Sequence, residues 1–127
     1  MIFVLVATAD LSGDLISYAL REGIGRERPP LVYPQAKPLV STPHSGAFPS
    51  GHATIAFACA TVLARTAPRF AIPSFVLAAA IAWSRVYVGV HWPLDVLGGA
   101  ALGILVATAL LRLVRVRPRS RRAPRTG

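Results

Sequence analysis

The chain contains one cysteine and only five acidic residues among its 127 residues, against 14 Lys and Arg residues. A single thiol, Cys59, excludes an internal disulfide framework and any metal site built from cysteines. Met1 leads directly into apolar residues, so the positively charged beginning of a secretory signal peptide is also missing. With one cysteine, the sequence leaves the redox compartment open.

Hydrophobic residues are what the sequence has in abundance. They make up 54% of the chain, and the mean hydropathy is +0.53. A soluble domain of this length does not usually carry so much apolar surface, because a small domain cannot bury it. The composition therefore favours a single domain embedded in a membrane.

Four apolar stretches approach the length of roughly 20 residues that crosses the bilayer core as a helix. They cover residues 2–20, 52–67, 70–90 and 94–113. The second is short, so we expect it to begin at Ser50 or Gly51 and to lie partly in the interface. The predicted fold class is all-α: an integral membrane helical bundle with about four transmembrane helices.

The connections between these stretches predict how the helices run. Ala67-Pro68-Arg69 and His91-Trp92-Pro93 are short links, which make the helices on either side antiparallel neighbours. The segment between the first two stretches is too rich in proline for a continuous helix, and we expect an extended surface loop there. Its prolines are Pro29, Pro30, Pro34, Pro38, Pro43 and Pro49.

Helices that alternate in direction bring three dispersed clusters of polar residues to one face of the membrane. The end of the first span, the start of the second, the end of the third and the start of the fourth all lie there. A single site can therefore be built from distant parts of the sequence. The clusters are Arg21 with Arg28-Pro29, then Pro49-Ser50-Gly51-His52, then Ser84-Arg85 with His91 and Asp95.

Positive charge is concentrated at the end of the chain, where half of the Lys and Arg residues lie between Arg112 and Arg125. A basic run directly after an apolar helix is typical of a cytoplasmic membrane anchor. We therefore interpret residues 114–127 as a disordered basic cytoplasmic tail and expect no nucleic acid as partner. Arg65 and Arg69 lie on the tail side. The positive-inside rule then predicts a multi-pass protein of the cell membrane whose polar clusters lie on the outer, periplasmic or extracellular, face.

The turn Ser50-Gly51-His52 has the properties of a phosphate cradle. A helix that starts there offers unpaired backbone N–H groups, the positive end of the helix dipole, a hydroxyl and a glycine that permits close approach of an anion. Arg28 and Arg85 can add planar guanidinium groups that bind phosphate oxygens in pairs.

The two histidines of the clusters have different partners. His91 and Asp95 are four residues apart, so at a helix start the carboxylate can reach back to one imidazole nitrogen. Asp95 would fix the tautomer and stabilise the cationic ring, which leaves the other nitrogen of His91 to attack phosphorus. His52 would protonate the departing oxygen as a general acid.

In these clusters the chain resembles the type 2 phosphatidic acid phosphatase superfamily, membrane phosphatases related in their site to vanadium haloperoxidases. The family pattern is Lys-x6-Arg-Pro, Pro-Ser-Gly-His and Ser-Arg-x5-His-x3-Asp. The second and third motifs match fully, and the resemblance covers residues 14 to 113. The first motif has Arg21 where the family usually has lysine, which keeps a cationic donor but changes the geometry of the contact.

The resemblance implies that residues 1–113 form a membrane-embedded phosphatase domain. Its reaction would be metal-independent and cofactor-free hydrolysis of a lipid phosphomonoester or diphosphate through a phosphohistidine on His91, with His52 as acid and then as activator of water. Undecaprenyl diphosphate, phosphatidic acid and phosphatidylglycerophosphate are all compatible substrates. The transferring phosphoryl group would be stabilised by Arg21, Arg28, Ser50, Gly51 and Arg85.

Two other functions stay open. A vanadate-dependent haloperoxidase has a similar site, although the membrane spans argue against it. A truncated, inactive membrane protein that acts by association would also retain the motifs. The intact histidines and Asp95 weigh against inactivity.

Two features concern the assembly of the bundle. Family members usually have six spans, so we interpret Met1 as a late start and expect the first two family helices to be missing. Gly99 and Gly103 form a small-xxx-small pair suited to close packing within the protomer or between protomers, which leaves a homo-oligomer open. In the first span, Asp14 shares a helical stripe with Arg21; it either supports that arginine or faces the missing helices.

Overall fold

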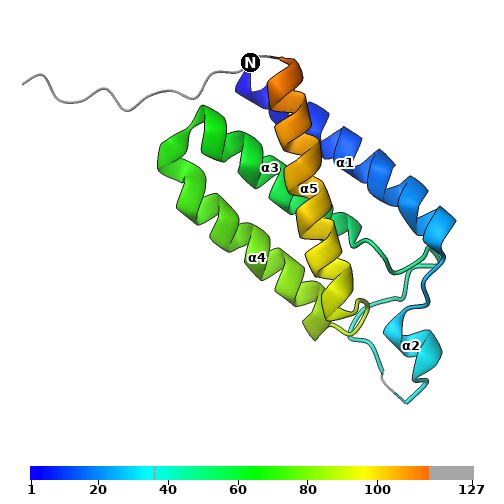
Figure 1. Cartoon of the computed structure of the whole chain (residues 1–127). Helices are drawn as coiled ribbons and strands as arrows, with labels where there is room; N and C mark the ends of the chain where they lie inside the picture. Colours follow the sequence, from blue (N-terminus) through cyan, green and yellow to red (C-terminus); the bar gives the residue numbers. More distant parts are fainter. Residues whose placement is uncertain (36, 115–127) are drawn as a thin grey trace, which may run out of the picture.

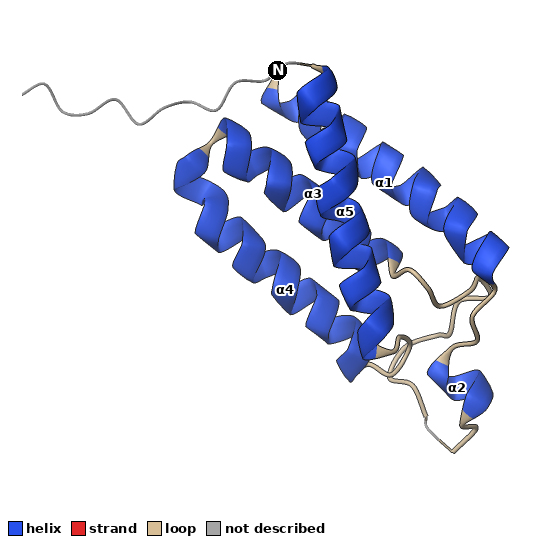
Figure 2. Ribbon diagram, in the orientation of Figure 1, coloured by secondary structure: helices blue, strands red, loops and turns tan. Residues whose placement is uncertain are grey.

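The computed structural model describes residues 1–35 and 37–114 and shows a bundle of four long helices (Figure 1). The described residues contain no strand (Figure 2), which confirms the predicted all-helical fold class. Consecutive long helices run in opposite directions. They are α1 (Ile2–Ile24), α3 (Gly51–Thr66), α4 (Ala71–Tyr87) and α5 (Pro93–Leu113).

Three helical segments of the described chain are long and apolar enough to cross a membrane. They cover Ile2–Val32, Pro68–Tyr87 and Pro93–Leu113. The remaining long helix, α3, has 16 residues, which agrees with the expectation of a short second span that starts at the Ser50-Gly51 turn.

Helix α3 lies at the centre of the bundle and packs against α1, α4 and α5. The residues it buries are small, which lets the neighbouring helices approach closely. One apolar cluster joins α3 to α1 and α5 through Ala9, Ala58 and Ala107, and a second joins it to α4 through Ala53 and Ala82. The interior of this bundle is therefore held by close contact of small side chains.

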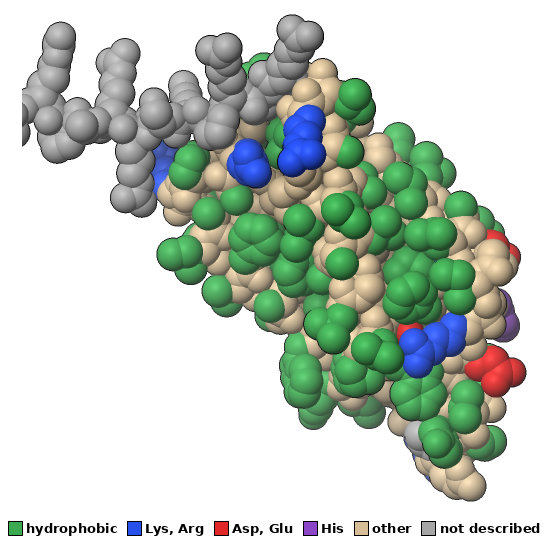
Figure 3. All heavy atoms as spheres, in the orientation of Figure 1, with side chains coloured by type: hydrophobic (Ala, Val, Ile, Leu, Met, Phe, Trp, Pro, Cys, Tyr) green, Lys and Arg blue, Asp and Glu red, His purple; other side chains and the backbone are tan. Residues whose placement is uncertain are grey.

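The large apolar side chains point outward instead. Phe3 is 88% exposed, Ile72 79% and Leu113 82%. On the face seen in Figure 3, apolar side chains cover the middle of the bundle, while Lys and Arg lie toward its two ends. An exposed apolar belt between charged ends is the surface that a bilayer requires.

The glycine pair of α5 faces α3. A Cβ atom at Gly99 would collide with the carbonyl oxygen of Ser50, and one at Gly103 with the carbonyl oxygen of Thr54. The small-xxx-small pair therefore packs within the protomer, and of the two arrangements predicted for it the intramolecular one is observed.

The connection from α1 to α3 closes one end of the bundle. Helix α1 ends at Ile24, and the residue that caps it, Gly25, has a left-handed backbone (φ 63°) that suits glycine. A single helical turn, α2 (Pro29–Val32), begins with proline at its first position, so the predicted extended loop contains one short helix. Backbone hydrogen bonds from Leu39 to Val88 and from Ala47 to Arg26 fasten the loop to the other elements.

The three polar clusters meet at the loop end of the bundle, as the alternation of helix direction predicts. The N-terminus and the C-terminal end of α5 lie at the opposite end (Figure 1). A short 3-10 helix, Pro68–Phe70, links α3 to α4. Apart from Val114, the predicted tail lies outside the described residues.

Candidate active site

A cavity of about 230 Å³ lies where the polar clusters meet. Most of the predicted site residues line it, whereas Ser50 and Asp95 are not among the lining residues and are fully buried. Asp14, Pro43, Ser45 and Ile55 complete the lining. The predicted residues that line the cavity are Arg21, Arg28, Gly51, His52, Arg85 and His91.

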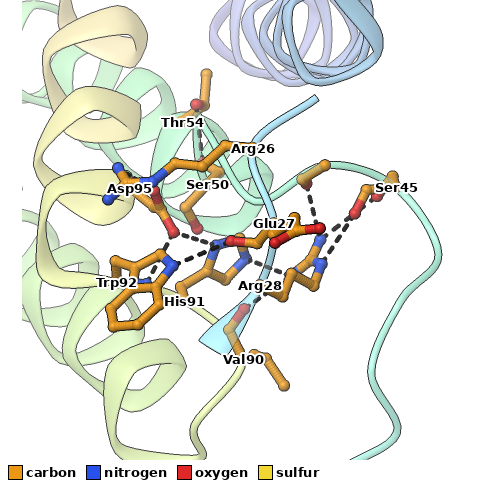
Figure 4. Close-up of polar contacts among 11 residues, drawn as sticks. Arg26, Glu27, Arg28, Ser45, Ser50, Thr54, Val90, His91, Trp92 and Asp95 are labelled. Atoms are coloured by element: carbon orange, nitrogen blue, oxygen red, sulfur yellow. Dashed lines mark hydrogen bonds and ion pairs between the residues drawn. The ribbon is translucent and has the colours of Figure 1, made fainter. Parts of the chain in front are cut away.

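Arg28 ties the loops around the cavity together. Its guanidinium group donates to the carbonyl oxygens of Ser45 (3.0 Å), Gly46 (3.1 Å) and Val90 (2.9 Å) (Figure 4). The side chain is 3% exposed. Its Nη1 atom also lies 3.2 Å from Nε2 of His91. Because a guanidinium group only donates, this contact makes Nε2 the acceptor nitrogen of a neutral imidazole.

Arg21 reaches the cavity from the last turns of α1. Its Nη1 atom donates to Ser17 Oγ at 3.1 Å, and Nη2 lies 4.0 Å from a carboxylate oxygen of Asp14. A Cβ atom at Gly51 would collide with this guanidinium group. Glycine at the start of α3 therefore lets Arg21 lie directly against the first turn of that helix, where helix geometry leaves backbone N–H groups without intrahelical acceptors.

Asp95 is held mainly by groups other than His91. Its Oδ1 atom accepts a hydrogen bond from Arg26 at 3.0 Å, and Oδ2 accepts one from the backbone N–H of Trp92 at 2.8 Å (Figure 4). Nδ1 of His91 lies 3.5 Å from Oδ2 and makes no hydrogen bond to it. The carboxylate thus lies on the Nδ1 side of the ring, and Arg28 lies on the Nε2 side.

His91 is neutral in this environment. Burial of the ring, strengthened by the positive charge of Arg28, lowers the pKa of His91 to about 3. An uncharged imidazole keeps a lone pair on the nitrogen that faces Arg28, and that lone pair is what a nucleophile requires.

Unsatisfied polar groups gather at this site. Among the described residues, the buried side-chain atoms without a hydrogen-bond partner are Arg21 Nε, Ser50 Oγ, Arg85 Nε and His91 Nδ1. All four belong to the predicted site. Buried polar atoms without partners are rare in folded proteins, so their concentration here indicates a place where a polar ligand binds.

Two contributors to the site carry no signal in the sequence motifs. Arg26 lies between the two arginines of the first motif and contacts Asp95 from 69 positions away. Ser45 lies in the proline-rich loop, where its carbonyl oxygen holds Arg28. Both contacts depend on how the loop folds back, which helix periodicity does not predict. His44, the neighbour of Ser45, is exposed.

Arginine is the most frequent charged residue in the lining of the cavity. The described residues include no group of three or more His, Cys, Asp or Glu side chains that could hold a metal ion. A sequence model of the PAP2 superfamily matches residues 2–119. The chain belongs to the PAP2 superfamily. The three PAP2 motifs are thus the residues that the fold brings to one end of the bundle.

Known PAP2 proteins include both sequence and structural relatives of this chain. It is 47% identical to an undecaprenyl-diphosphatase of Sulfolobus acidocaldarius over 62 residues, which are 48% of this chain and 30% of that protein. It is 36% identical to a decaprenylphosphoryl-5-phosphoribose phosphatase of Mycobacterium tuberculosis over 107 residues, 84% of this chain and 58% of that protein.

A solved structure shares the fold. The PAP2 type phosphatidylglycerolphosphate phosphatase of Bacillus subtilis superposes with a TM-score of 0.72 and 32% sequence identity, over 93% of this chain and 61% of that one. This chain therefore spans less than two thirds of each of these three proteins. With its apolar helices, the shared fold makes the chain a membrane protein.

Proposed function

We propose that this PAP2 chain is a membrane lipid phosphatase that hydrolyses a phosphomonoester or diphosphate through a phosphohistidine on His91. The observation that carries the proposal is the cavity in which three arginines surround the buried imidazole of His91, while the site residues hold four buried polar atoms without partners, one of them on that ring. Phosphoryl transfer needs positioning and compensation of negative charge, and this cavity supplies both.

Binding of the phosphate would use the cationic wall of the cavity. Arg21 and Arg85 would donate to the phosphoryl oxygens, together with the backbone N–H groups at Gly51 and the hydroxyl of Ser50. The five N–H groups of Arg28 all have protein acceptors, so Arg28 would bind phosphate by exchanging its contact with His91 for a phosphoryl oxygen. Arg28 already contacts Nε2 of His91. The same guanidinium group would therefore guide a phosphorus atom toward that nitrogen.

The first chemical step would form a bond between Nε2 of His91 and phosphorus while the bond from phosphorus to the leaving oxygen breaks. His52 would enter this step protonated, with the negative charge of the bound phosphate offsetting that of the neighbouring arginines, and would give its proton to the leaving oxygen. Asp95, held by Arg26 and Trp92, would stabilise the positive charge that develops on the His91 ring. The products of this step are the free alcohol, or lower phosphate, and the phosphorylated enzyme.

The second step would return the enzyme to its starting state. His52, now neutral, would take a proton from a water molecule, whose oxygen attacks phosphorus as the bond to Nε2 breaks. Inorganic phosphate leaves, His91 becomes neutral again and His52 carries its proton. No group in this sequence of steps requires a metal ion or a cofactor.

A lipid phosphate is the substrate class that fits the position of the site. The cavity lies at one end of an apolar bundle, which in a bilayer would put it at the level of the lipid headgroups. The relatives named above act, by their names, on polyprenyl or glycerolipid phosphates. We place this face on the outer side and the basic tail in the cytoplasm, because Arg65, Arg69 and Arg112 lie toward the opposite end.

Phosphate release from a panel of lipid phosphates, measured in the presence of a chelator, tests the proposal. The purified chain should release phosphate, and His91→Ala and His52→Ala should each abolish most of it. His44→Ala is the matched control, since His44 is exposed and does not line the cavity. Unchanged release in both active-site variants would show the mechanism to be wrong.

A further inference from the structure

A second hollow lies between α3 and α4, beside the phosphate cavity. It has a volume of about 330 Å³. Residues of α3 line one side, and Leu77, Ala78 and Ile81 of α4 line the other. We call it the α3–α4 groove.

The α3–α4 groove and the phosphate cavity share two lining residues, His52 and Ile55. A molecule that occupies both would therefore pass His52, which the proposed mechanism places beside the leaving oxygen. In a lipid phosphate, the lipid part lies on the far side of that oxygen, directly in a polyprenyl monophosphate and after one further phosphate in a diphosphate. The groove therefore begins beside His52, on the side of the phosphate cavity toward which the hydrocarbon part of the substrate would extend.

The lining of the groove suits hydrocarbon. Beyond His52, the side chains from α3 are Ile55, Ala56, Cys59, Ala60 and Leu63. The only hydroxyl group among the lining residues, that of Ser74, donates to the carbonyl oxygen of Ala71 and is thereby satisfied. From His52 to Leu63 the groove follows α3 for roughly 16 Å, at about 1.5 Å per residue.

We propose that the α3–α4 groove binds the hydrocarbon chain of the lipid phosphate substrate, next to the bound phosphate. This inference rests on the proposed function, since it assigns the occupant from the continuity of the groove with the phosphate cavity. Burying the chain there would hold the leaving oxygen at His52 and would favour amphiphilic over soluble phosphate esters.

A separate apolar hollow along α4 is a built-in control. Ile72, Phe75, Val76 and Ala79 line this hollow, which shares no residue with the phosphate cavity. Ordinary bilayer lipid or detergent can cover either surface. Only the α3–α4 groove should respond to a lipid that also carries a phosphate.

Cys59, the single cysteine of the chain, reports on the groove directly. The rate of its alkylation by an apolar maleimide would be measured in neutral detergent, in a His91→Ala chain that does not turn substrate over. Farnesyl diphosphate at about ten times its Kd should slow alkylation about tenfold. Farnesol and inorganic phosphate, each added alone at the same concentration, should leave the rate unchanged.

The matched chain carries Cys59→Ala and Ala79→Cys in the same background. Its alkylation should not respond to farnesyl diphosphate. Equal protection at both positions, or equal protection by farnesol, would overturn the inference in favour of general coverage by lipid. A Cys59 that never reacts would also overturn it, because the groove would then be covered by protein, either a second copy or another segment.

Kinetics with a chain blocked at Ala56 separate this inference from the proposed function. Ala56→Leu should raise the KM for farnesyl diphosphate about tenfold, because the larger side chain would displace part of the hydrocarbon from the groove. It should leave hydrolysis of a short soluble phosphate ester unchanged. Ala79→Leu should change neither. Equal effects of Ala56→Leu on both substrates would contradict the groove, whereas absence of phosphate release from every substrate in the parent chain would contradict the proposed function.

Discussion

At the scale of single residues, the carboxylate of Asp95 has partners on two sides. Arg26 and the Trp92 amide hold its oxygens, and the His91 ring lies 3.5 Å away. The Arg26 side chain is 37% exposed, and the Asp95 side chain is fully buried. We therefore propose that Arg26 is a positioning residue, which acts on the proposed nucleophile through Asp95.

Replacing Arg26 should slow turnover without weakening substrate binding. Arg26→Gln removes a charge-assisted hydrogen bond of about 1.5–3 kcal/mol, so kcat should fall about ten- to a hundredfold while KM stays within about twofold. Arg26→Lys should restore part of the loss, and Arg65→Gln, at the opposite end of the bundle, should have no effect. Parallel loss of kcat and folded protein would show that Arg26 serves only the fold.

Gly51 should be sensitive to even one added methyl group, because a Cβ atom there displaces the Arg21 guanidinium group. Gly51→Ala should weaken inhibition by inorganic phosphate about tenfold, as expected for loss of one charged hydrogen-bond partner. Arg21→Ala should have a similar effect. The double variant should be no worse than either single one, and additive losses would refute the coupling between the two residues.

The low pKa of His91 predicts how stability depends on pH. Folding lowers this pKa to about 3 from an unfolded value of about 6.5. Below about pH 6.5 the unfolded chain therefore binds a proton that the folded chain does not, and stability falls as the pH is lowered toward 3. Thermal unfolding in detergent should show this fall, and His91→Gln should reduce it. An identical pH dependence in both chains would contradict a neutral, buried His91.

At the scale of elements, the contact between α3 and α5 sets the positions of two motifs. The N–H group of Ser50 donates to the carbonyl oxygen of Asp95 at 2.9 Å, which joins the second motif to the third. Gly99 and Gly103 allow the two helices to approach this closely. The glycine pair thus fixes the second motif against the third through the backbone.

Gly103→Ala should lower the stability of the chain by about 1–3 kcal/mol, the usual effect of overpacking. Its added methyl group would meet the backbone of α3, which cannot rotate away. Gly23→Ala is the control, because a Cβ atom there meets nothing within 4 Å. Thermal unfolding in detergent compares the two, and equal stability of the Gly103 variant and the parent would disprove the close helix contact.

Much of this element structure could be predicted from hydropathy and proline. The apolar stretches 52–67 and 94–113 match α3 and α5 within a residue or two, because a turn or proline marks each start. Helix α1 continues past the predicted end to Ile24, since the charged residues at its end still favour helix and only Gly25 stops it. The short helix α2 was not predicted, because the density of prolines argued against helix in this segment. Proline is nevertheless tolerated at the first position of a helix, which is where Pro29 lies.

At the scale of the whole molecule, helix direction decides where the site lies. Alternation predicted that motifs separated by tens of residues would meet at one end of the bundle, and the structure brings them to one cavity. The contacts of Arg26 and Ser45 could not be predicted in this way. They arise from a loop whose path is fixed by hydrogen bonds between distant backbone groups, for which hydrophobic periodicity gives no signal.

In the proposed mechanism, His91 carries the phosphoryl group during turnover. The most direct measurement is to mix the chain with a lipid phosphate labelled in its terminal phosphoryl group, to quench in base, which preserves phosphohistidine, and to locate the label by mass spectrometry. We expect label on His91 in the parent chain and none in His91→Ala, which should also release no phosphate. Label on another residue, or sustained turnover by His91→Ala, would contradict this mechanism.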